Sequence, residues 1–308
     1  MKNTKLSRLL LFITMLMWAV GAQCETPFML PLPEVPSNLT EPSDRAAFVA
    51  SHYWDGMDWN NSELLNSEEF MGESMATFGT LLSIAGPEKA KTIVNDFIAR
   101  LSGNQAGLTA AANYSYSYFY APESPYYNED IFRMFVDNLL KTSGLPDLSK
   151  EKLLLYNTYL NKNRLGEKAA DFEYIGEDGK KKHLLSTARD SDLKLLIFYD
   201  PDCHVCEENF EIISDSEILN QKVLEGKISI VTINAFGQSA PGAALRKQGM
   251  QAQWIVGYSP NGDVDENEIY AIRSIPTIYL LDKNYKVIDK DMSLERLKEF
   301  AQSPDLNQ

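Results

Sequence analysis

The sequence predicts an all-α N-terminal domain followed by an α/β C-terminal domain. Apolar residues recur at helical spacing over residues 44–163, and from residue 171 onward they gather instead in short runs of strand length. One such run, residues 195–199, leads into a turn that ends on Cys203 and Cys206. With 308 residues, of which 44% are apolar, the chain is long enough to bury a core in each of two domains.

The first 22 residues have the pattern of a secretory signal peptide. Lys2, Lys5 and Arg8 precede an apolar run at residues 9–20, which is shorter than a membrane-spanning helix requires. Small residues follow this run, so we expect cleavage after Ala22. The mature chain would then reach the periplasm, where disulfides persist and a pair of cysteines can exchange with them.

Cys24, just beyond the predicted cleavage site, is a candidate for the acylation found in bacterial lipoproteins. The residues before it lack the leucine and the adjacent small residue that favour this modification, so we favour ordinary cleavage. Residues 23–43 hold five prolines, which disfavour helix and strand alike, and we expect an extended tether there. Only if Cys24 is acylated do we expect contact with a membrane, and the tether would then hold the folded domains away from it.

Residues 44–163 are expected to form four to six helices. Apolar stripes at three- and four-residue spacing run along residues 71–82 and 131–139. Pro87 suits the first turn of a helix, and Ser149 is expected to cap the last one.

Two segments of this domain, residues 53–59 and 114–127, combine aromatic with polar side chains. Such surfaces bind sugars or peptides in some proteins. In others the rings simply pack between helices, and we favour this second interpretation because large aromatic side chains are usually part of a core.

The C-terminal domain, residues 165–308, contains a series of strand patterns. A turn signal at residues 177–180 indicates a hairpin, and the order of the central strands predicts a right-handed β-α-β crossover. An inserted helix is expected at residues 241–248, and Ser293 is expected to cap the closing helix. The predicted strands are residues 171–175, 181–185, 194–199, 227–234, 254–256, 277–281 and 285–288.

Cys203 and Cys206 are the candidate reactive pair. Cys206, Phe210 and Ile213 recur at helical spacing, so a helix is expected to begin at Cys203. A helix N-terminus offers unpaired N–H groups and a partial positive charge, which favour a thiolate over a thiol. We therefore expect Cys203 to be the attacking sulfur and Cys206, one turn later on the same face, to form a disulfide with it.

Other uses of two cysteines must be weighed against this one. The spacing alone leaves a buried structural disulfide open. Attachment of a c-type haem requires a histidine directly after the second cysteine, and Glu207 stands there. Zinc requires two further ligands at suitable spacing, so no metal is expected. The remaining cysteine and histidines, none of them paired at that spacing, are Cys24, His52, His183 and His204.

A second motif, Ile275-Pro276-Thr277, opens another strand-like run. The strand, the CxxC helix and this late Ile-Pro-Thr together resemble the thioredoxin fold, and residues 166–172 resemble the opening motif of its extracytoplasmic branch, which includes the cytochrome-maturation reductases. The resemblance covers the chain from residue 165 onward. It implies that Pro276 is cis and faces the disulfide, that the backbone of Ile275 pairs with a bound peptide, and that the redox-active disulfide serves without a further cofactor.

The whole arrangement resembles secreted bacterial thioredoxin-family proteins whose helical N-terminal domain has no assigned activity. Several residues nevertheless depart from the family pattern. Asp202 replaces the usual tryptophan before the first cysteine, Glu207 follows the second, and Ile197 replaces a buried acid that assists the second cysteine in many relatives. His204 either stabilises a neighbouring thiolate or is an exposed, tolerated residue, whereas Asp202 and Glu207 favour the protonated thiol.

The formal net charge of −14 argues against nucleic acid as a partner. Our leading hypothesis is an extracytoplasmic thiol–disulfide oxidoreductase that reduces protein disulfides. The reducing direction rests on the resemblance. Its partners would be protein thiols and disulfides, together with an electron donor in the membrane or periplasm. The alternative is a non-catalytic binding or assembly protein whose helical domain holds a partner and whose CxxC is structural or vestigial.

Overall fold

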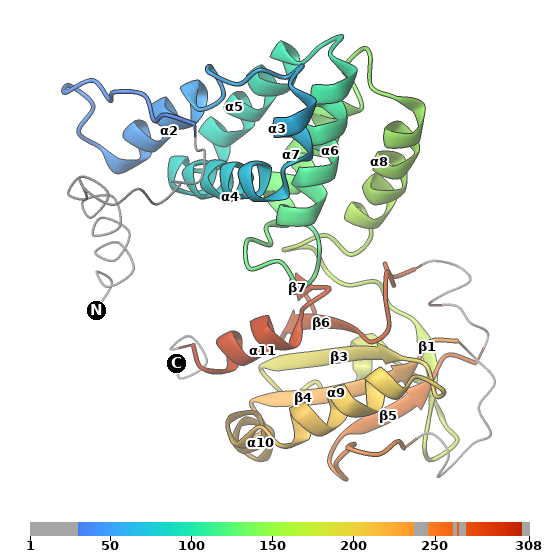
Figure 1. Ribbon diagram of the computed structural model, residues 1–308. Coiled ribbons are helices and arrows are strands. Elements are labelled where there is room, and N and C mark those ends of the chain that lie inside the picture. The colour runs from blue at the N-terminus through green and yellow to red at the C-terminus, as the bar shows by residue number, and fades with distance from the viewer. Residues whose placement is uncertain (1–29, 237–245, 261–263, 265–268, 304–308) are drawn as a thin grey trace.

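The computed structural model describes residues 30–236, 246–260, 264 and 269–303. Within this part, a helical domain precedes a domain built on one mixed sheet (Figure 1), so the predicted order of an all-α and an α/β domain is confirmed. None of the helices described has the length and apolar character to cross a membrane. The predicted signal peptide, Cys24 and most of the predicted helix at residues 241–248 lie outside the described residues.

Seven helices are described before the sheet, more than the four to six predicted. The pattern missed α6 because most of its buried side chains are small, namely Ala, Gly and Ser. The first helix begins at Pro42, inside the predicted tether, and Leu30 is only 5% exposed against the helical core. The helices are α2 (Pro42–His52), α3 (Ser62–Asn66), α4 (Glu68–Ala85), α5 (Pro87–Arg100), α6 (Gln105–Phe119), α7 (Glu129–Leu139) and α8 (Asp147–Leu160).

Side-chain caps begin most of these helices. Asn61, Ser67, Asn104 and Asn128 each accept a hydrogen bond from a backbone N–H of the first turn. The predicted cap Ser149 is wrong, because it lies inside the first turn of α8 and is buried. Pro146, extended at φ −60° and ψ 144°, already precedes the helix, and it leaves the helix without a side-chain cap.

Aromatic rings fill the centre of the helical domain. Tyr53 and Trp54 are 1% and 3% exposed, and the Trp54 ring stacks on Phe97 with centroids 5.5 Å apart. Tyr120, which is fully buried, stacks on Phe132 at 4.5 Å. The rings of Tyr53, Trp54 and Tyr120 therefore pack in the core, as we expected, whereas other rings of the second aromatic segment line a cavity or reach the surface.

The C-terminal domain is built on a seven-stranded sheet in the order β2-β1-β5-β4-β3-β6-β7. The central strand β3 pairs in parallel with β4 and antiparallel with β6. Each predicted strand has a counterpart. The strands are β1 (Glu173–Gly176), β2 (Lys181–His183), β3 (Leu193–Tyr199), β4 (Ile228–Asn234), β5 (Ile255–Tyr258), β6 (Thr277–Asp282) and β7 (Val287–Lys290).

Both faces of this sheet are covered, which explains the unbroken apolar run of β3. Leu195, Ile197 and Tyr199 pack in one core with side chains of three helices, whereas Leu196 and Phe198 belong to the core of the opposite face. The three helices are α9 (His204–Ser214), α10 (Glu217–Leu224) and α11 (Leu294–Ala301) (Figure 1). The sequence pattern did not single out α10, while Ser293 caps α11 as predicted by accepting the Arg296 N–H.

Candidate active site

Cys203 lies at the N-terminus of α9, immediately after the turn that follows β3. It is the N-cap residue, and its sulfur accepts a hydrogen bond from the Cys206 N–H, with Sγ and N 3.2 Å apart. The side chain is partly exposed. Because a helix N-terminus and an N–H donor both stabilise negative charge, this sulfur occupies a position suited to a nucleophile.

Cys206 is in a different environment, although both cysteines are free thiols in this structure. Its side chain is fully buried in the core beneath α9. Burial raises the pKa of the Cys206 thiol far above its ordinary value, and the hydrogen bond with Cys203 adds to the effect. Cys206 therefore keeps its proton at neutral pH, and in this form it would not compete with Cys203 as the sulfur that attacks a substrate disulfide.

Ile275 and Pro276 lie beside the cysteine pair. The antiparallel register sets Phe198 of β3 opposite Thr277 of β6, which brings the loop before β6 to the cysteine end of β3. The Ile275–Pro276 peptide bond is cis, and the Cys203 Sγ is 4.0 Å from the Ile275 carbonyl oxygen. The fold thus brings together the four residues that the sequence singled out as the site and its groove.

The residues predicted to modulate the thiol pKa lie at the surface around the cysteine pair. The His204 side chain is 83% exposed, with its Nε2 3.3 Å from a Glu208 oxygen and its Nδ1 4.0 Å from a Glu207 oxygen. Asp202 is also exposed, and its backbone N–H donates to Asp200. Both ion-pair contacts described for His204 are with carboxylates, which favours its interpretation as an exposed, tolerated residue.

One charged group near Cys206 was missed. Ile197 is fully buried in the core below α9, so no acid occupies that position. Asp200 acts on Cys206 instead: a hydrogen bond to the Asp200 backbone lowers the pKa of the Cys206 thiol, and the Asp200 charge raises that pKa. The signal for this residue was present in the sequence, because an aspartate directly follows the buried strand that leads to the cysteines.

A cavity of about 250 Å³ opens beside Pro276. It is formed by both domains, since the loop between α6 and α7 supplies part of its wall. No local sequence pattern connects this loop with the site. The residues that surround the cavity include Pro122 and Glu123 from that loop, Val205 and Asn209 from α9, and Ile275 and Pro276.

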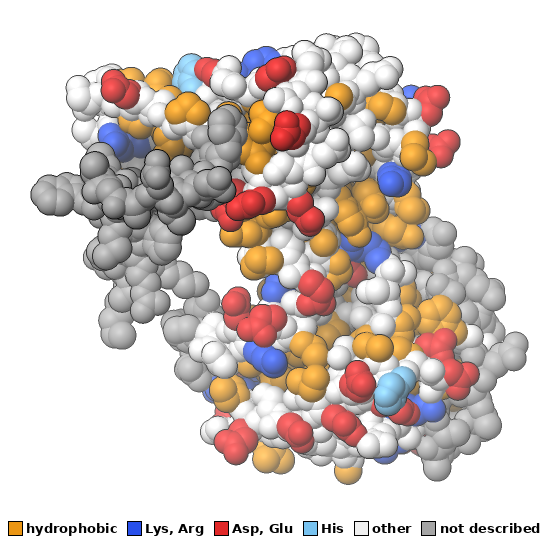
Figure 2. All heavy atoms as spheres, viewed as in Figure 1, with side chains coloured by type: hydrophobic (Ala, Val, Ile, Leu, Met, Phe, Trp, Pro, Cys, Tyr) orange, Lys and Arg blue, Asp and Glu red, His pale blue; other side chains and the backbone are white. Residues whose placement is uncertain are grey.

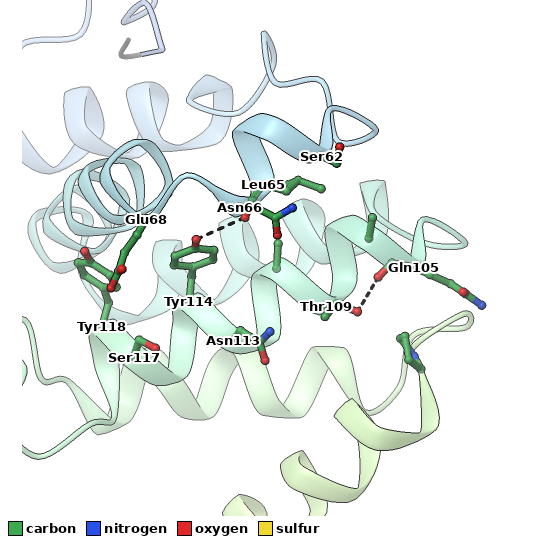
Figure 3. Close-up of a pocket in the computed structure, with 13 residues that line it drawn as sticks. Ser62, Leu65, Asn66, Glu68, Gln105, Thr109, Asn113, Tyr114, Ser117 and Tyr118 are labelled. Atoms are coloured by element: carbon green, nitrogen blue, oxygen red, sulfur yellow. Dashed lines mark hydrogen bonds between the residues drawn. The ribbon is translucent and has the colours of Figure 1, made fainter. Parts of the chain in front are cut away.

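A second, larger cavity of about 720 Å³ opens in the helical domain (Figure 3). Glu68 and Tyr118 lie at one end of it, and Gln105 and Thr109 at the other. The Tyr114 hydroxyl donates to the Leu65 carbonyl at 3.3 Å. The lining offers hydroxyl and amide groups, so this cavity suits the binding of a polar molecule and lacks the sulfur that redox exchange requires.

The surface near α9 is acidic. Figure 2 shows acidic side chains over both halves of the visible face, with several over the lower half, where α9 and α10 lie. Across the ranges that the structure describes, no three histidine, cysteine or acidic side chains are placed to hold a metal ion. The site therefore combines two thiols with a surrounding surface rich in acidic side chains.

A crystal structure of a thioredoxin-like protein from Bacteroides caccae is similar to this chain over most of its length. The two are 25% identical, the match covers 88% of this chain and 97% of the other, and the TM-score is 0.74. The C-terminal domain has the thioredoxin fold. The expectation drawn from the CxxC and Ile-Pro-Thr motifs is thus confirmed for the fold.

Two structures from Bacteroides fragilis match less of the chain. The C-terminal domain of an uncharacterised protein is 27% identical, with 46% of this chain and 99% of the other covered and a TM-score of 0.40. A conserved protein of unknown function is 32% identical, with 44% and 98% covered and a TM-score of 0.41. Residues 13–163 match a family described as a domain of unknown function (DUF5106). No curated protein matches the chain.

Proposed function

We propose that this protein is a thiol–disulfide oxidoreductase that reduces the disulfides of exported proteins. One observation carries the proposal: a partly exposed Cys203 caps α9, a buried Cys206 follows one turn later, and the Ile275–Pro276 loop lies alongside. The thioredoxin fold supports it, because the fold places these elements at one end of its central strand.

In the proposed reaction, the Cys203 thiolate attacks one sulfur of a substrate disulfide. The S–S bond breaks, the second substrate sulfur leaves as a thiolate and takes up a proton, and a mixed disulfide joins Cys203 to the substrate. Cys206 then loses its proton and attacks the Cys203 sulfur, which releases the first substrate thiol. The substrate has gained two electrons, and a thiol donor of the membrane or periplasm must reduce the new Cys203–Cys206 disulfide.

The proposed location is the periplasm, because the first 22 residues have the composition of a signal peptide. The mass of the mature protein tests this proposal. An N-terminus at Gln23 supports simple export, a diacylglyceryl group on Cys24 places the protein on a membrane, and a retained leader contradicts export.

The decisive experiment is reduction of insulin by the purified mature protein, with dithiothreitol as the electron donor. We expect the wild-type protein to accelerate reduction and Cys203→Ser to show only the background rate of dithiothreitol. Cys206→Ser should still attack and should accumulate mixed disulfides, because it cannot resolve them.

A wild-type rate equal to that of Cys203→Ser would contradict the proposal. The alternative, a non-catalytic binding protein, would then be favoured. The cavity of about 720 Å³ in the helical domain supports that alternative, since it offers polar groups to a ligand and its described lining contains no cysteine.

A further inference from the structure

The loop between α6 and α7, residues 120–128, makes direct contact with the thioredoxin-like domain. Figure 1 shows it reaching from the helical domain towards β6 and β7. Arg273 donates a hydrogen bond to the Tyr120 carbonyl at 3.1 Å, and the Tyr127 hydroxyl donates to the Lys290 carbonyl at 3.4 Å. Both ends of the loop are therefore hydrogen-bonded to the thioredoxin-like domain, one to Arg273 close to the Ile275–Pro276 segment and the other to Lys290 at the end of β7.

Two cation–π contacts hold the same loop. The Arg273 guanidinium lies 3.7 Å from the centre of the Tyr120 ring, and that of Arg296 lies 3.8 Å from the centre of the Tyr127 ring. Such contacts are strongest where water is excluded, and the Arg273 side chain is only 7% exposed. The loop is thus fixed on the thioredoxin-like domain by contacts that its own domain does not supply.

The loop is also braced internally. The Ser124 hydroxyl donates to the Tyr118 carbonyl at 2.5 Å, and the Asn128 N–H donates to the Phe119 carbonyl at 2.9 Å. Pro122 and Glu123 lie between these anchored positions. Their placement at the cavity beside Pro276 is therefore a defined feature of the fold.

The cavity beside Pro276 has an acidic lining. Glu123 is exposed at its wall, and Asp291 lies in the wall with its side chain only 2% exposed. One Asp291 oxygen is 2.8 Å from the Arg273 Nε, and the other has no hydrogen-bond partner among the described residues. The described lining contains no lysine or arginine, and the Arg273 guanidinium behind it is paired with Asp291, so a cationic group entering the cavity would meet the exposed Glu123 carboxylate.

The size of the cavity indicates what can enter it. About 250 Å³ is less than the roughly 300–1,000 Å³ of sites that enclose small molecules, and it suits one side chain of a longer peptide. The cavity adjoins Ile275 and Pro276, so that side chain would belong to a residue close to the substrate cysteine.

We propose that the α6–α7 loop is a specificity element that selects disulfide-bonded peptides with a lysine or arginine close to the cysteine under attack. Glu123 binds the cationic group, the buried Asp291 carboxylate adds negative charge behind the wall, and Pro122 shapes it. The inference rests on the proposed disulfide reduction and assigns to the helical domain a direct part in it. The helical domain is thereby part of the substrate-binding site.

The test uses the full mature chain in its reduced form and follows a single turnover, so no electron donor is needed. Three peptides of equal length carry one cysteine in a mixed disulfide with thionitrobenzoate and differ only in the neighbouring residues, which are lysine, glutamine or glutamate. The released thionitrobenzoate gives a second-order rate constant for each peptide. We expect the lysine peptide to react roughly fivefold faster than the glutamine peptide, because a partly exposed ion pair contributes up to about that factor.

The variant Glu123→Lys should lower or invert the ratio of the lysine rate to the glutamine rate. The matched control is Glu151→Lys, an exposed charge reversal on α8 that lies outside the cavity wall and should leave the ratio unchanged. Equal rates for the three peptides in the wild type, or a ratio that Glu123→Lys does not alter, would overturn the inference while leaving disulfide reduction intact. If no peptide reacts faster than with Cys203→Ser, the proposed function itself has failed and the specificity with it.

Discussion

Cys203 and Cys206 have the same side chain, but their surroundings differ, and this difference suggests different roles for the two thiols. Cys203 is partly exposed and accepts an N–H hydrogen bond, whereas Cys206 is fully buried. Burial raises the pKa of Cys206, so at neutral pH this residue is a protonated thiol that reagents reach poorly. We therefore propose that position along the first turn of α9 determines which sulfur attacks.

This difference predicts the order of alkylation. In the reduced protein, a brief and limiting exposure to iodoacetamide should label Cys203 first, since only a thiolate that solvent reaches reacts quickly. Mass spectrometry of the peptides identifies the labelled residue, and the denatured protein, in which both thiols are exposed, is the control. Label that appears first on Cys206 would reverse the proposed roles.

At the scale of elements, α9 positions the cysteine pair because its buried face is anchored in the core. Phe210 is fully buried, with its ring centre 5.5 Å from that of Tyr199 and 5.9 Å from that of Trp254. Gly249 passes so close to the same helix, at φ 82°, that a Cβ on it would lie 2.5 Å from the Glu211 nitrogen. The helix N-terminus is thus held in place by contacts one to two turns away.

Truncation of Phe210 should therefore weaken both the fold and the site. Phe210→Ala leaves a cavity between α9 and the sheet, and we expect a loss of about 3–5 kcal/mol in the free energy of unfolding. Urea denaturation of the full chain measures it, and insulin reduction reports the effect on the site. The control is Ile212→Ala on the same helix. Because the Ile212 side chain is 43% exposed, this variant should change the free energy of unfolding little. Equal stability of the two variants would show that Phe210 does not anchor α9.

The elements differ in how far the sequence predicts them. The apolar run of β3 and the spacing of Cys206, Phe210 and Ile213 predict the strand and helix at the site, because burial on a face leaves a periodic pattern. The small buried residues of α6 leave no such pattern. The contact of Glu123 with the groove was also missed, because it depends on loops more than 150 residues apart, and no local pattern records such a contact.

At the scale of the whole molecule, buried charge joins the two domains, whose boundary we propose at residues 163–166. Lys290 of β7 has its Nζ 3.1 Å from Glu129 of α7, and neither side chain is more than 1% exposed. Lys290 also donates to the carbonyls of Leu160 and Lys162 at the end of α8. Burial raises the pKa of Glu129 and lowers that of Lys290, and each partner opposes the shift of the other.

Removal of Lys290 leaves the buried Glu129 carboxylate with Arg133, 3.3 Å away, as its partner, so Lys290→Met should cost about 3 kcal/mol, the lower end of the range for a broken buried pair. We expect calorimetry to show one unfolding transition for the wild type and two for Lys290→Met, because the docked domains stabilise each other through this pair. The double variant Glu129→Gln with Lys290→Met should recover part of the loss, since it removes the buried carboxylate whose charge Lys290 offset. Lys286→Met, a matched change at an exposed lysine next to β7, should have no such effect. A single, unshifted transition in Lys290→Met would mean that the buried pair does not hold the domains together, and the α6–α7 loop would then need another anchor to keep its place at the groove.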